Sequence, residues 1–274
     1  MQGYKAISSH LDGWNGSIAG FVRDLDRRGA RYIAYTQISA LEFCPYRYYL
    51  ECVKRIRPRP QPDYFTKGTI FHAAAAKYYR GLFRKRSVTI ESLHALIDRH
   101  DRLDGHHLKN AITLALQNAH DEWEVVAVEE PFVLSLSDGQ PPCIGVVDLI
   151  LRKGKHYVVV DHKTGNRFYE PDELQIAIYR EFVRRRFQSL SCTAFFDQYR
   201  WVNNLDRIRK PAFQRTEIKC TSKEWRVAEQ KLARSYQRMQ SILEKDDAPG
   251  TGECFLCPLK DQCKKASFNS YGGW

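Results

Sequence analysis

Two aspartates and a lysine occupy one predicted β-hairpin and could together hold a metal ion. The segment GVVDLILRKGKHYVVVDHKTG contains Asp148, Asp161 and Lys163, with the turn at Gly154 and Lys155. With this turn Asp148 lies directly opposite Asp161, and the Cβ atoms of such a pair are about 4.5–5.5 Å apart. Because like charges that face each other destabilise a strand pair, the two carboxylates require a cation. The alternative is a register slip of one residue, which would send the two side chains to opposite faces.

Side-chain alternation along the second strand adds a basic group to this pair. Asp161 and Lys163 share one face of the strand, whereas His162 points to the other face. Carboxylates, carbonyls and water suit hard divalent ions such as Mg²⁺ or Mn²⁺, which bind phosphate oxygens and activate water. The backbone carbonyl of His162 is a further candidate ligand. The pattern therefore indicates chemistry on a phosphate ester.

A second candidate metal site lies in the cysteines. Cys254, Cys257 and Cys263 form a short run near the end of the chain, a spacing suited to wrapping a metal or a cluster. A fourth ligand is required, since structural zinc and cubane iron-sulfur clusters each take four thiolates, and the cysteine count does not separate the two. Cys44 and Cys52 are the upstream candidates. The remaining cysteines lie within or beside apolar segments and are predicted to be buried thiols: Cys143, Cys192 and Cys220.

The elements that would position these residues alternate between helical and strand patterns. Residues 1–35 show no clear period and are expected to add a short helix packed on the body. Helices are expected at 36–54, despite Pro45, at about 69–84, in less sharply bounded stretches over 89–122, at 171–187 and at 222–244. A proline-rich connector at 58–64 ends the first of these helices.

Segments rich in β-branched residues supply the strands. Three lie within residues 125–139, 143–155 and 156–165, separated by turn signals at 137–139 and 153–155. Two more are expected at 192–201 and 213–219, around a loop at Asn203-Asn204. The order of elements predicts an α/β fold with a mixed central sheet flanked by helices.

The composition favours a globular intracellular protein with a polyanionic partner. The 274 residues are 43% hydrophobic, which is ample for a buried core, and their net charge of +11 favours nucleic acid. No run approaches the roughly 18 apolar residues of a membrane span, and the first residues lack the pattern of a signal peptide. We therefore expect a cytoplasmic location and no membrane partner. Without a secretory signal, eight cysteines indicate metal ligands and buried thiols rather than a disulfide framework.

The hairpin motifs resemble the core signature of the PD-(D/E)XK nuclease superfamily. The GxxDLI strand followed by VVVDHKTG implies Asp148 as the first acid, with Asp161 and Lys163 as the second acid and the lysine. Downstream, LQIAIYR resembles the Gln-x-x-x-Tyr element of the RecB-like branch. Gln175 and Tyr179 are four residues apart and project from one helix face. The resemblance implies that they steer the DNA strand or the scissile phosphate.

The resemblance continues upstream of the hairpin. GTIFHAAAAKYY looks like the histidine-bearing helix of the same branch, which implies that His72 joins Asp148 and Asp161 in binding one or two Mg²⁺ or Mn²⁺ ions. Glu129 or Glu130 is expected to add another acid, and the sequence does not choose between them.

FCPYRYYLE resembles the leading cysteine helix of the iron-sulfur RecB-like nucleases. In those proteins one cysteine before the core and three after it bind a 4Fe-4S cluster. This implies Cys44 with Cys254, Cys257 and Cys263, rather than Cys52, and a cluster that pins the C-terminal segment to an N-terminal helix.

Taken together, the resemblance implies a metal-dependent DNA nuclease, acting as an exonuclease on single-stranded or free ends in recombination, repair or CRISPR adaptation. The chain most resembles stand-alone RecB-like exonucleases, and this resemblance is compatible with a helicase or recombination partner. The expected layout is a lead at 1–35, a nuclease domain at 36–265 with a helical insertion at about 66–123 and the cysteine clasp, and a tail at 266–274. Two alternatives are a non-catalytic iron-sulfur DNA-binding subunit of a helicase-nuclease complex and a zinc-stapled RNA-binding protein.

Overall fold

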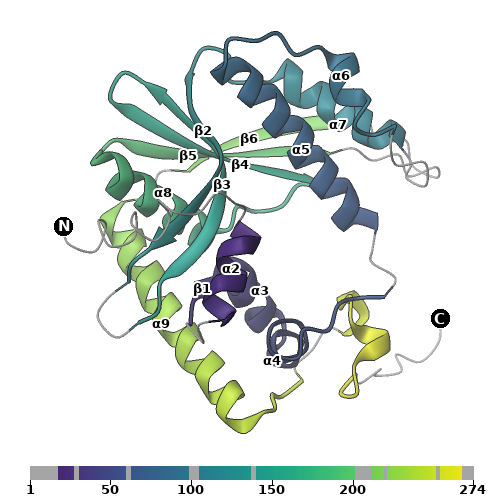
Figure 1. Ribbon diagram of the computed structural model, residues 1–274, viewed down its shortest axis with the longest axis vertical. Coiled ribbons are helices and arrows are strands. Elements are labelled where there is room, and N and C mark those ends of the chain that lie inside the picture. Colours follow the sequence, from purple (N-terminus) through teal and green to yellow (C-terminus); the bar gives the residue numbers. More distant parts are fainter. Residues whose placement is uncertain are drawn as a thin grey trace.

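A mixed β-sheet with helices on both faces organises the chain (Figure 1). The computed structural model describes residues 18–27, 31–59, 63–98, 105–136, 140–200, 211–218, 221–250 and 254–266. The expected turn at 137–139, the Asn203-Asn204 loop, Cys220 and almost all of the expected tail lie outside these residues. The α/β fold with a mixed sheet is the one that the sequence predicts.

Six strands form the sheet in the described part of the chain. They are β1 (Ile33–Ala34), β2 (Glu124–Leu134), β3 (Cys143–Lys153), β4 (His156–Gly165), β5 (Cys192–Arg200) and β6 (Ala212–Ile218). Their order is β1-β3-β4-β5-β6, and β2 pairs with β3. The β1–β3 and β4–β5 pairs are parallel, whereas β2–β3, β3–β4 and β5–β6 are antiparallel.

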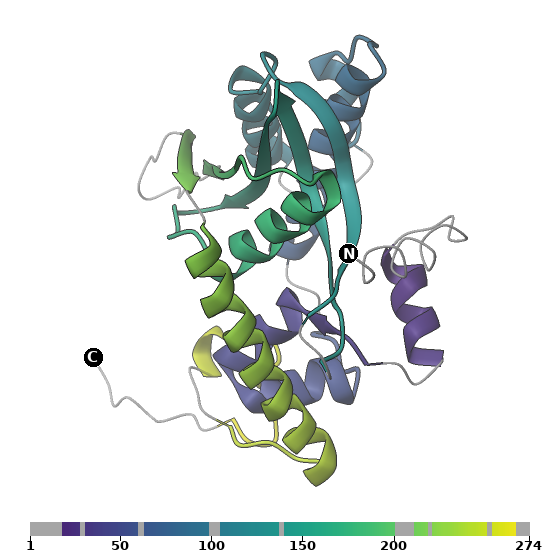
Figure 2. The same cartoon turned by 90° about the vertical axis from the view of Figure 1, so that its left-hand side faces the viewer.

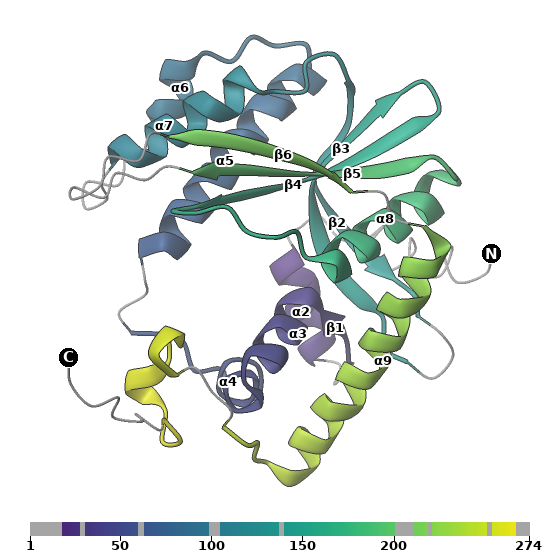
Figure 3. The same cartoon turned by 180° about the vertical axis from the view of Figure 1, so that it is seen from behind.

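The helices divide between the two faces (Figures 1 and 3). One face carries α5 (Asp63–Phe83), α6 (Ile90–His94) and α7 (Gly105–Gln117). The other face carries α3 (Tyr35–Phe43), α8 (Glu173–Phe187) and α9 (Ser222–Lys245). The expected short helix of the N-terminal lead is α2 (Ile18–Arg27), which lies on the opposite side of the β2–β3 pair from α9 (Figure 2). No described helix combines the length and hydrophobicity needed to cross a membrane.

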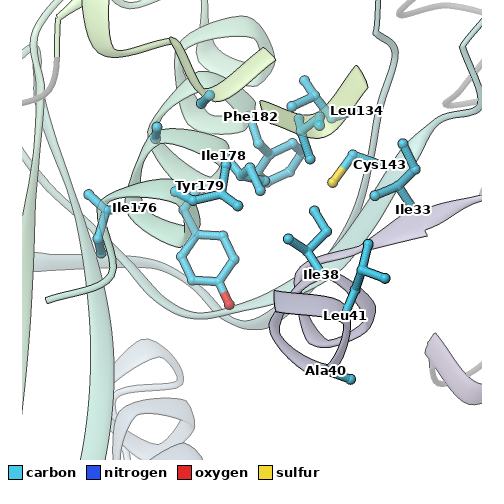
Figure 4. Close-up of a cluster of buried hydrophobic side chains, with 14 of the residues drawn as sticks. Ile33, Ile38, Ala40, Leu41, Leu134, Cys143, Ile176, Ile178, Tyr179 and Phe182 are labelled. Atoms are coloured by element: carbon cyan, nitrogen blue, oxygen red, sulfur yellow. The ribbon is translucent and has the colours of Figure 1, made fainter. Parts of the chain in front are cut away.

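Alternation along the strands supplies both faces with core residues. Val158 and Val160 pack with the α5 side chains, whereas Val159 between them packs with α3 and α8. The apolar run before Asp161 is therefore buried on both faces, as a central strand requires. Figure 4 shows Ile38 and Leu41 of α3 opposite Phe182 of α8, with Cys143 of β3 beside them. Burial of one such aliphatic or aromatic side chain contributes about 1.5–3 kcal/mol. Cys143 and Cys192 are buried thiols, as predicted.

The continuous helix expected from Thr36 is wrong. The chain is extended at Cys44, with φ −164° and ψ 121°, and resumes as α4 (Pro45–Tyr48) and a π-helical turn, η1 (Tyr49–Val53). The break arises because a proline ring disfavours the α conformation in the residue before it. The helical hydrogen bonds nevertheless continue on both sides of the break, since the Cys44 N–H donates to the Ala40 carbonyl at 3.0 Å and the Cys44 carbonyl accepts from the Tyr48 N–H at 3.1 Å. In addition, α5 begins at Asp63, six residues earlier than the sequence predicts.

Candidate metal centre

The candidate site lies where β3 and β4 part. Their ladder runs from Lys153↔His156 to Leu149↔Val160, which confirms the predicted register. Beyond that pair, β4 continues beside β5 as far as Gly165. At the fork, the backbone N–H of His162 donates a hydrogen bond of 2.9 Å to the Asp148 carboxylate. Asp148 therefore bridges the two strands where their backbones separate.

Three side chains from different elements converge at this fork. His72 of α5 places Nδ1 3.6 Å from the Asp148 carboxylate and 3.9 Å from that of Glu129 on β2. One ligand atom from each lies within 4.8 Å of the others, and within the described ranges no further group of three His, Cys, Asp or Glu residues meets this limit. His72 and Glu129 are about one-third exposed, and Asp148 is 13% exposed. An imidazole and two carboxylates so arranged can hold a divalent cation that remains open to solvent on one side.

Glu129 reaches this group through an unusual backbone. The β2–β3 ladder pairs Val128 with Leu149 and Glu130 with Val147, so Glu129 lies across from Asp148. Its φ of +53° is in the left-handed region, which costs a non-glycine residue on the order of 1–3 kcal/mol and is concentrated at functional sites. Of the two glutamates between which the sequence does not choose, the structure brings Glu129 into the group and not Glu130.

Asp161 and Lys163 form an ion pair beside the group. The Lys163 ammonium lies 2.9 Å and 2.8 Å from the two Asp161 carboxylate oxygens, so the two side chains share a face as predicted. Asp161 is 1% exposed. Burial and the nearby Asp148 charge raise the pKa of Asp161 to about 6, although the Lys163 ammonium acts to lower it. Asp161 is not one of the three residues within 4.8 Å, so the structure places this expected ligand next to the compact group.

Burial and the neighbouring carboxylates both shift the pKa values at the site. Burial, and then the Asp148 carboxylate, raise the pKa of Glu129. The pKa of Lys163 is raised although burial opposes its charge, because the Asp161 and Asp148 carboxylates outweigh that effect. Carboxylates crowded in this way favour protons or a cation, and a divalent ion would relieve both the burial cost and the repulsion.

His162 faces away from the carboxylates, as alternation predicts. Its imidazole is buried among Phe71, Tyr79 and Tyr199, with the ring stacked on Tyr79 at a centroid separation of 6.0 Å. Burial lowers the pKa of His162 to about 4, so the ring is neutral at physiological pH. The imidazole is therefore not positioned as a ligand, and a role for the backbone carbonyl stays a prediction.

Gln175 and Tyr179 lie on one face of α8 and bind each other, with Gln175 Nε2 donating to the Tyr179 hydroxyl at 2.7 Å. Both side chains are buried, and Figure 4 shows Tyr179 among apolar residues. Burial and the charges of Asp161 and Asp148 raise the pKa of Tyr179 far above its usual value. Tyr179 therefore lies within the electrostatic influence of the two aspartates, and direct contact of the pair with a substrate strand stays a prediction.

Sequence reasoning missed the residues that hold this helix in place. The Asp172 carboxylate caps α8 by accepting from the Gln175 backbone N–H at 3.1 Å, and it also accepts from the Tyr35 hydroxyl at 2.7 Å. This links α3 to α8 beside the site. An Asp directly before a helix is a recognisable N-cap, but Tyr35 is 137 residues away and carries no local signal.

The two groups of cysteines meet, as the sequence predicts. Cys44, Cys254, Cys257 and Cys263 line one small cavity together with basic side chains, Arg47, Lys260 and Lys265 among them. The C-terminal turns η2 (Cys254–Leu256) and η3 (Lys260–Gln262) lie beside α4 (Figure 3).

Further contacts hold the two segments together. Tyr46 donates its backbone N–H to the Pro249 carbonyl at 3.1 Å, and Gln262 donates to the Arg57 carbonyl at 3.2 Å. Cys52 does not line the cavity, and burial raises its pKa to about 11.

The spacing of the four thiols bears on the kind of centre that they can hold. All four belong to the described residues, yet no three of their sulfurs lie within 4.8 Å of one another. Four thiolates on one zinc ion, at about 2.3 Å each, would be separated by roughly 3.8 Å. At least one pair in every set of three of these sulfurs is therefore farther apart than two ligands of one zinc ion.

The chain is similar to one known protein family and to solved structures. The family described as the PD-(D/E)XK nuclease superfamily matches residues 32–264. Among solved structures, a protein named "Putative exonuclease" from Eubacterium rectale superposes with a TM-score of 0.52 at 11% identity, covering 86% of this chain and 89% of that one. The protein SSO0001 aligns with a TM-score of 0.38 at 15% identity, covering 93% of this chain and 100% of that one. No curated protein matches the chain.

Proposed function

Because the chain belongs to the PD-(D/E)XK nuclease superfamily, we propose that it is a Mg²⁺- or Mn²⁺-dependent DNA nuclease that hydrolyses phosphodiester bonds as an exonuclease on single-stranded ends. The observation that carries the proposal is the convergence of His72, Glu129 and Asp148 within 4.8 Å, with the Asp161–Lys163 pair beside them. The net charge of +11 suits a nucleic-acid substrate.

The donor set fits one or two hard divalent ions. His72, Glu129 and Asp148 would hold the cation, Asp161 would complete the site, and the His162 carbonyl is a further candidate. Bound there, a divalent ion would polarise the phosphate and lower the pKa of an attacking water. Lys163 remains 37% exposed while it holds Asp161, so its ammonium can also stabilise negative charge on the phosphate. Gln175 and Tyr179 are buried on α8, where their mutual hydrogen bond fixes both side chains.

Two observations support a single-stranded substrate with a free end. The solved structure with a TM-score of 0.52 is named as an exonuclease, which gives that activity as the first to test here. The cavity beside the metal group is lined by exposed aromatic side chains as well as by basic ones, and aromatic rings bind unpaired bases.

The test compares digestion of an end-labelled single-stranded oligonucleotide by the intact protein and by matched variants. With Mg²⁺ or Mn²⁺, Glu129→Gln and Asp148→Asn are expected to lower the rate on the order of 100-fold or more, because each removes a ligand charge. Glu130→Gln, one residue away on the same strand, is the control and should digest at the normal rate. Equal digestion by all variants would refute the site.

A second readout does not depend on turnover. Saturating Mn²⁺ should raise the melting temperature of the intact protein, because a ligand that binds only the folded state stabilises it. The same ion should raise it much less in Asp148→Asn. Metal-dependent stabilisation and DNA binding without any digestion would instead favour the non-catalytic DNA-binding reading.

We also propose that Cys44, Cys254, Cys257 and Cys263 hold a 4Fe-4S cluster that fastens the C-terminal segment to α4. Support comes from the cavity that the four cysteines share and from the absence of any three of their sulfurs within 4.8 Å of one another. Protein purified without oxygen should be brown and contain about four iron atoms per chain. Cys44→Ser should lose the colour, whereas Cys52→Ser should keep it. A colourless protein with one zinc per chain would overturn this assignment.

A further inference from the structure

A groove runs along one face of α5, beside His72, Glu129 and Asp148, which together form the candidate metal group. This α5 groove has a volume of about 610 Å³. It is lined by Tyr64, Phe65, Gly68, Thr69, His72, Ala73, Ala76, Arg80, Glu129, His162, Lys163 and Thr164. Fifteen residues separate Phe65 from Arg80, a length of about 22 Å at 1.5 Å per helical residue. His72 lies near the middle of this run, so a ligand lying in the groove passes the candidate metal group.

Two adjacent aromatic rings stand at one end of the groove. Tyr64 is 55% exposed and Phe65 is 40% exposed, and their ring centroids are 4.6 Å apart with a 33° angle between the planes. A single exposed aromatic residue is ordinary, but two neighbouring rings that line a cavity next to a metal group are not accounted for by packing. They present flat apolar surface to whatever enters the groove.

Small residues at the bottom of the groove leave space for a ligand. Gly68, Ala73 and Ala76 line it, although glycine inside a helix costs about 0.5–1 kcal/mol relative to alanine. A methyl group built on Gly68 would meet no heavy atom within 4 Å, so no described neighbour needs that space. The absence of a side chain there leaves the surface beside the two rings open to a ligand.

Two basic side chains, Arg80 and Lys163, line the groove away from the two rings. Arg80 lies at its far end, close enough to Glu129 to lower the pKa of that carboxyl in part. Lys163 lines the groove beside the metal group and is 37% exposed. Flat rings at one end and cations farther along match a nucleotide chain, whose bases stack and whose phosphates carry negative charge.

We propose that Tyr64 and Phe65 form a stacking platform for an unpaired nucleobase, and that the α5 groove is a binding subsite for single-stranded DNA next to the metal group. This inference rests on the proposed nuclease function and deepens it. The bases of a duplex are already stacked and paired, so their faces are not offered to the two rings. The platform would therefore select unpaired ends and set the strand so that a phosphate lies beside His72 and Asp148.

The test measures binding separately from hydrolysis. Fluorescence anisotropy of a labelled oligothymidylate of about 12 nucleotides, a length within the usual range of single-strand sites, is followed with Ca²⁺ in place of Mg²⁺. The double variant Tyr64→Ala/Phe65→Ala is expected to bind on the order of 10-fold more weakly than the intact protein. Phe83→Ala, which changes a 59% exposed aromatic residue at the other end of α5, is the matched control and should bind normally.

A second oligonucleotide isolates stacking from charge. An abasic strand of equal length keeps every phosphate but offers no base, so the intact protein should prefer the oligothymidylate by on the order of 10-fold. The double variant should show a much smaller preference, which makes the base and the two rings a coupled pair. Equal preference in the intact protein and the double variant would overturn the proposal, as would unchanged affinity of the double variant for the oligothymidylate.

The outcomes also separate this inference from the nuclease function on which it rests. Metal-dependent digestion that needs Asp148 but not the two rings would leave the nuclease proposal standing and remove the platform. Base-dependent binding that needs the two rings, without digestion by any metal, would support the platform and remove the nuclease proposal. Tyr64→Phe and Phe65→Tyr keep flat rings and should retain binding, which guards against a general loss of structure.

Discussion

Replacing Asp197 with asparagine should destabilise the protein strongly at neutral pH and less in acid. Asp197 lies on β5 and is fully buried. Arg215 of β6 donates to its two carboxylate oxygens at 2.8 Å and 2.9 Å, and His120 Nε2 lies 2.9 Å from one of them. Burial acts to raise the pKa of Asp197, but the hydrogen bonds from Arg215 and His120 outweigh it and lower that pKa to about 2.

The magnitude follows from the pKa. A carboxyl group whose pKa falls from 3.8 to about 2 on folding contributes about 2.5 kcal/mol to the free energy of unfolding at neutral pH. Asparagine removes this contribution and leaves the half-buried Arg215 without its charged partner, so the total loss is about 3 kcal/mol. Because the folded-state pKa is lowered, the contribution is complete above about pH 4 and is lost as pH falls through about 2.

Urea denaturation followed by circular dichroism measures the effect. For a chain of this size, a loss of about 3 kcal/mol lowers the urea midpoint by about 1 M at pH 7. The difference between Asp197→Asn and the intact protein should shrink to about half at pH 3. Asp121→Asn, which changes an exposed carboxylate that accepts from Tyr78, is the control and should stay within about 0.5 kcal/mol. Equal midpoints at pH 7, or a difference that does not shrink in acid, would refute the reasoning.

Three further substitutions test the packing and the helices by thermal unfolding. Gly145→Ala places a methyl group 2.7 Å from two atoms of the buried Phe132 ring and should destabilise by about 1–3 kcal/mol; an unchanged melting temperature would show that the ring can move aside. Gly68→Ala should instead stabilise by about 0.5–1 kcal/mol, since the position is helical and nothing in the described chain opposes the methyl group, and a lower melting temperature would contradict this. Thr221→Ala removes the capping box that Thr221 forms with Glu224 at the start of α9 and should cost about 1 kcal/mol, whereas Thr221→Ser should cost little.

The carboxylate hairpin is the part of the site that could be predicted from sequence. A short turn at Gly154, whose φ is +62°, sets the register of two adjacent strands, and alternation then decides which side chains share a face. The register, the shared face of Asp161 and Lys163 and the opposite orientation of His162 all follow from contacts within a few residues.

Residues joined over long separations were harder to assign. Glu129 joins the group because of the register in which β2 pairs with β3 and because its own backbone is left-handed. Neither feature can be predicted from the residues next to Glu129 in the sequence. Tyr35 reaches Asp172 across 137 residues. The continuous helix predicted through Pro45 is wrong because the restriction that proline places on Cys44 overrides the helical spacing of the apolar residues.

The sequence by itself determined the hairpin register, the mixed α/β fold and the two groups of cysteines, because each rests on residue type, alternation or local turn geometry. Only the tertiary structure decided which glutamate joins His72 and Asp148, and that the Gln175 and Tyr179 side chains are buried. It also brought Tyr64 and Phe65 to the mouth of a groove beside that group. These contacts join elements far apart in the chain, and their geometry depends on how whole helices and strands pack.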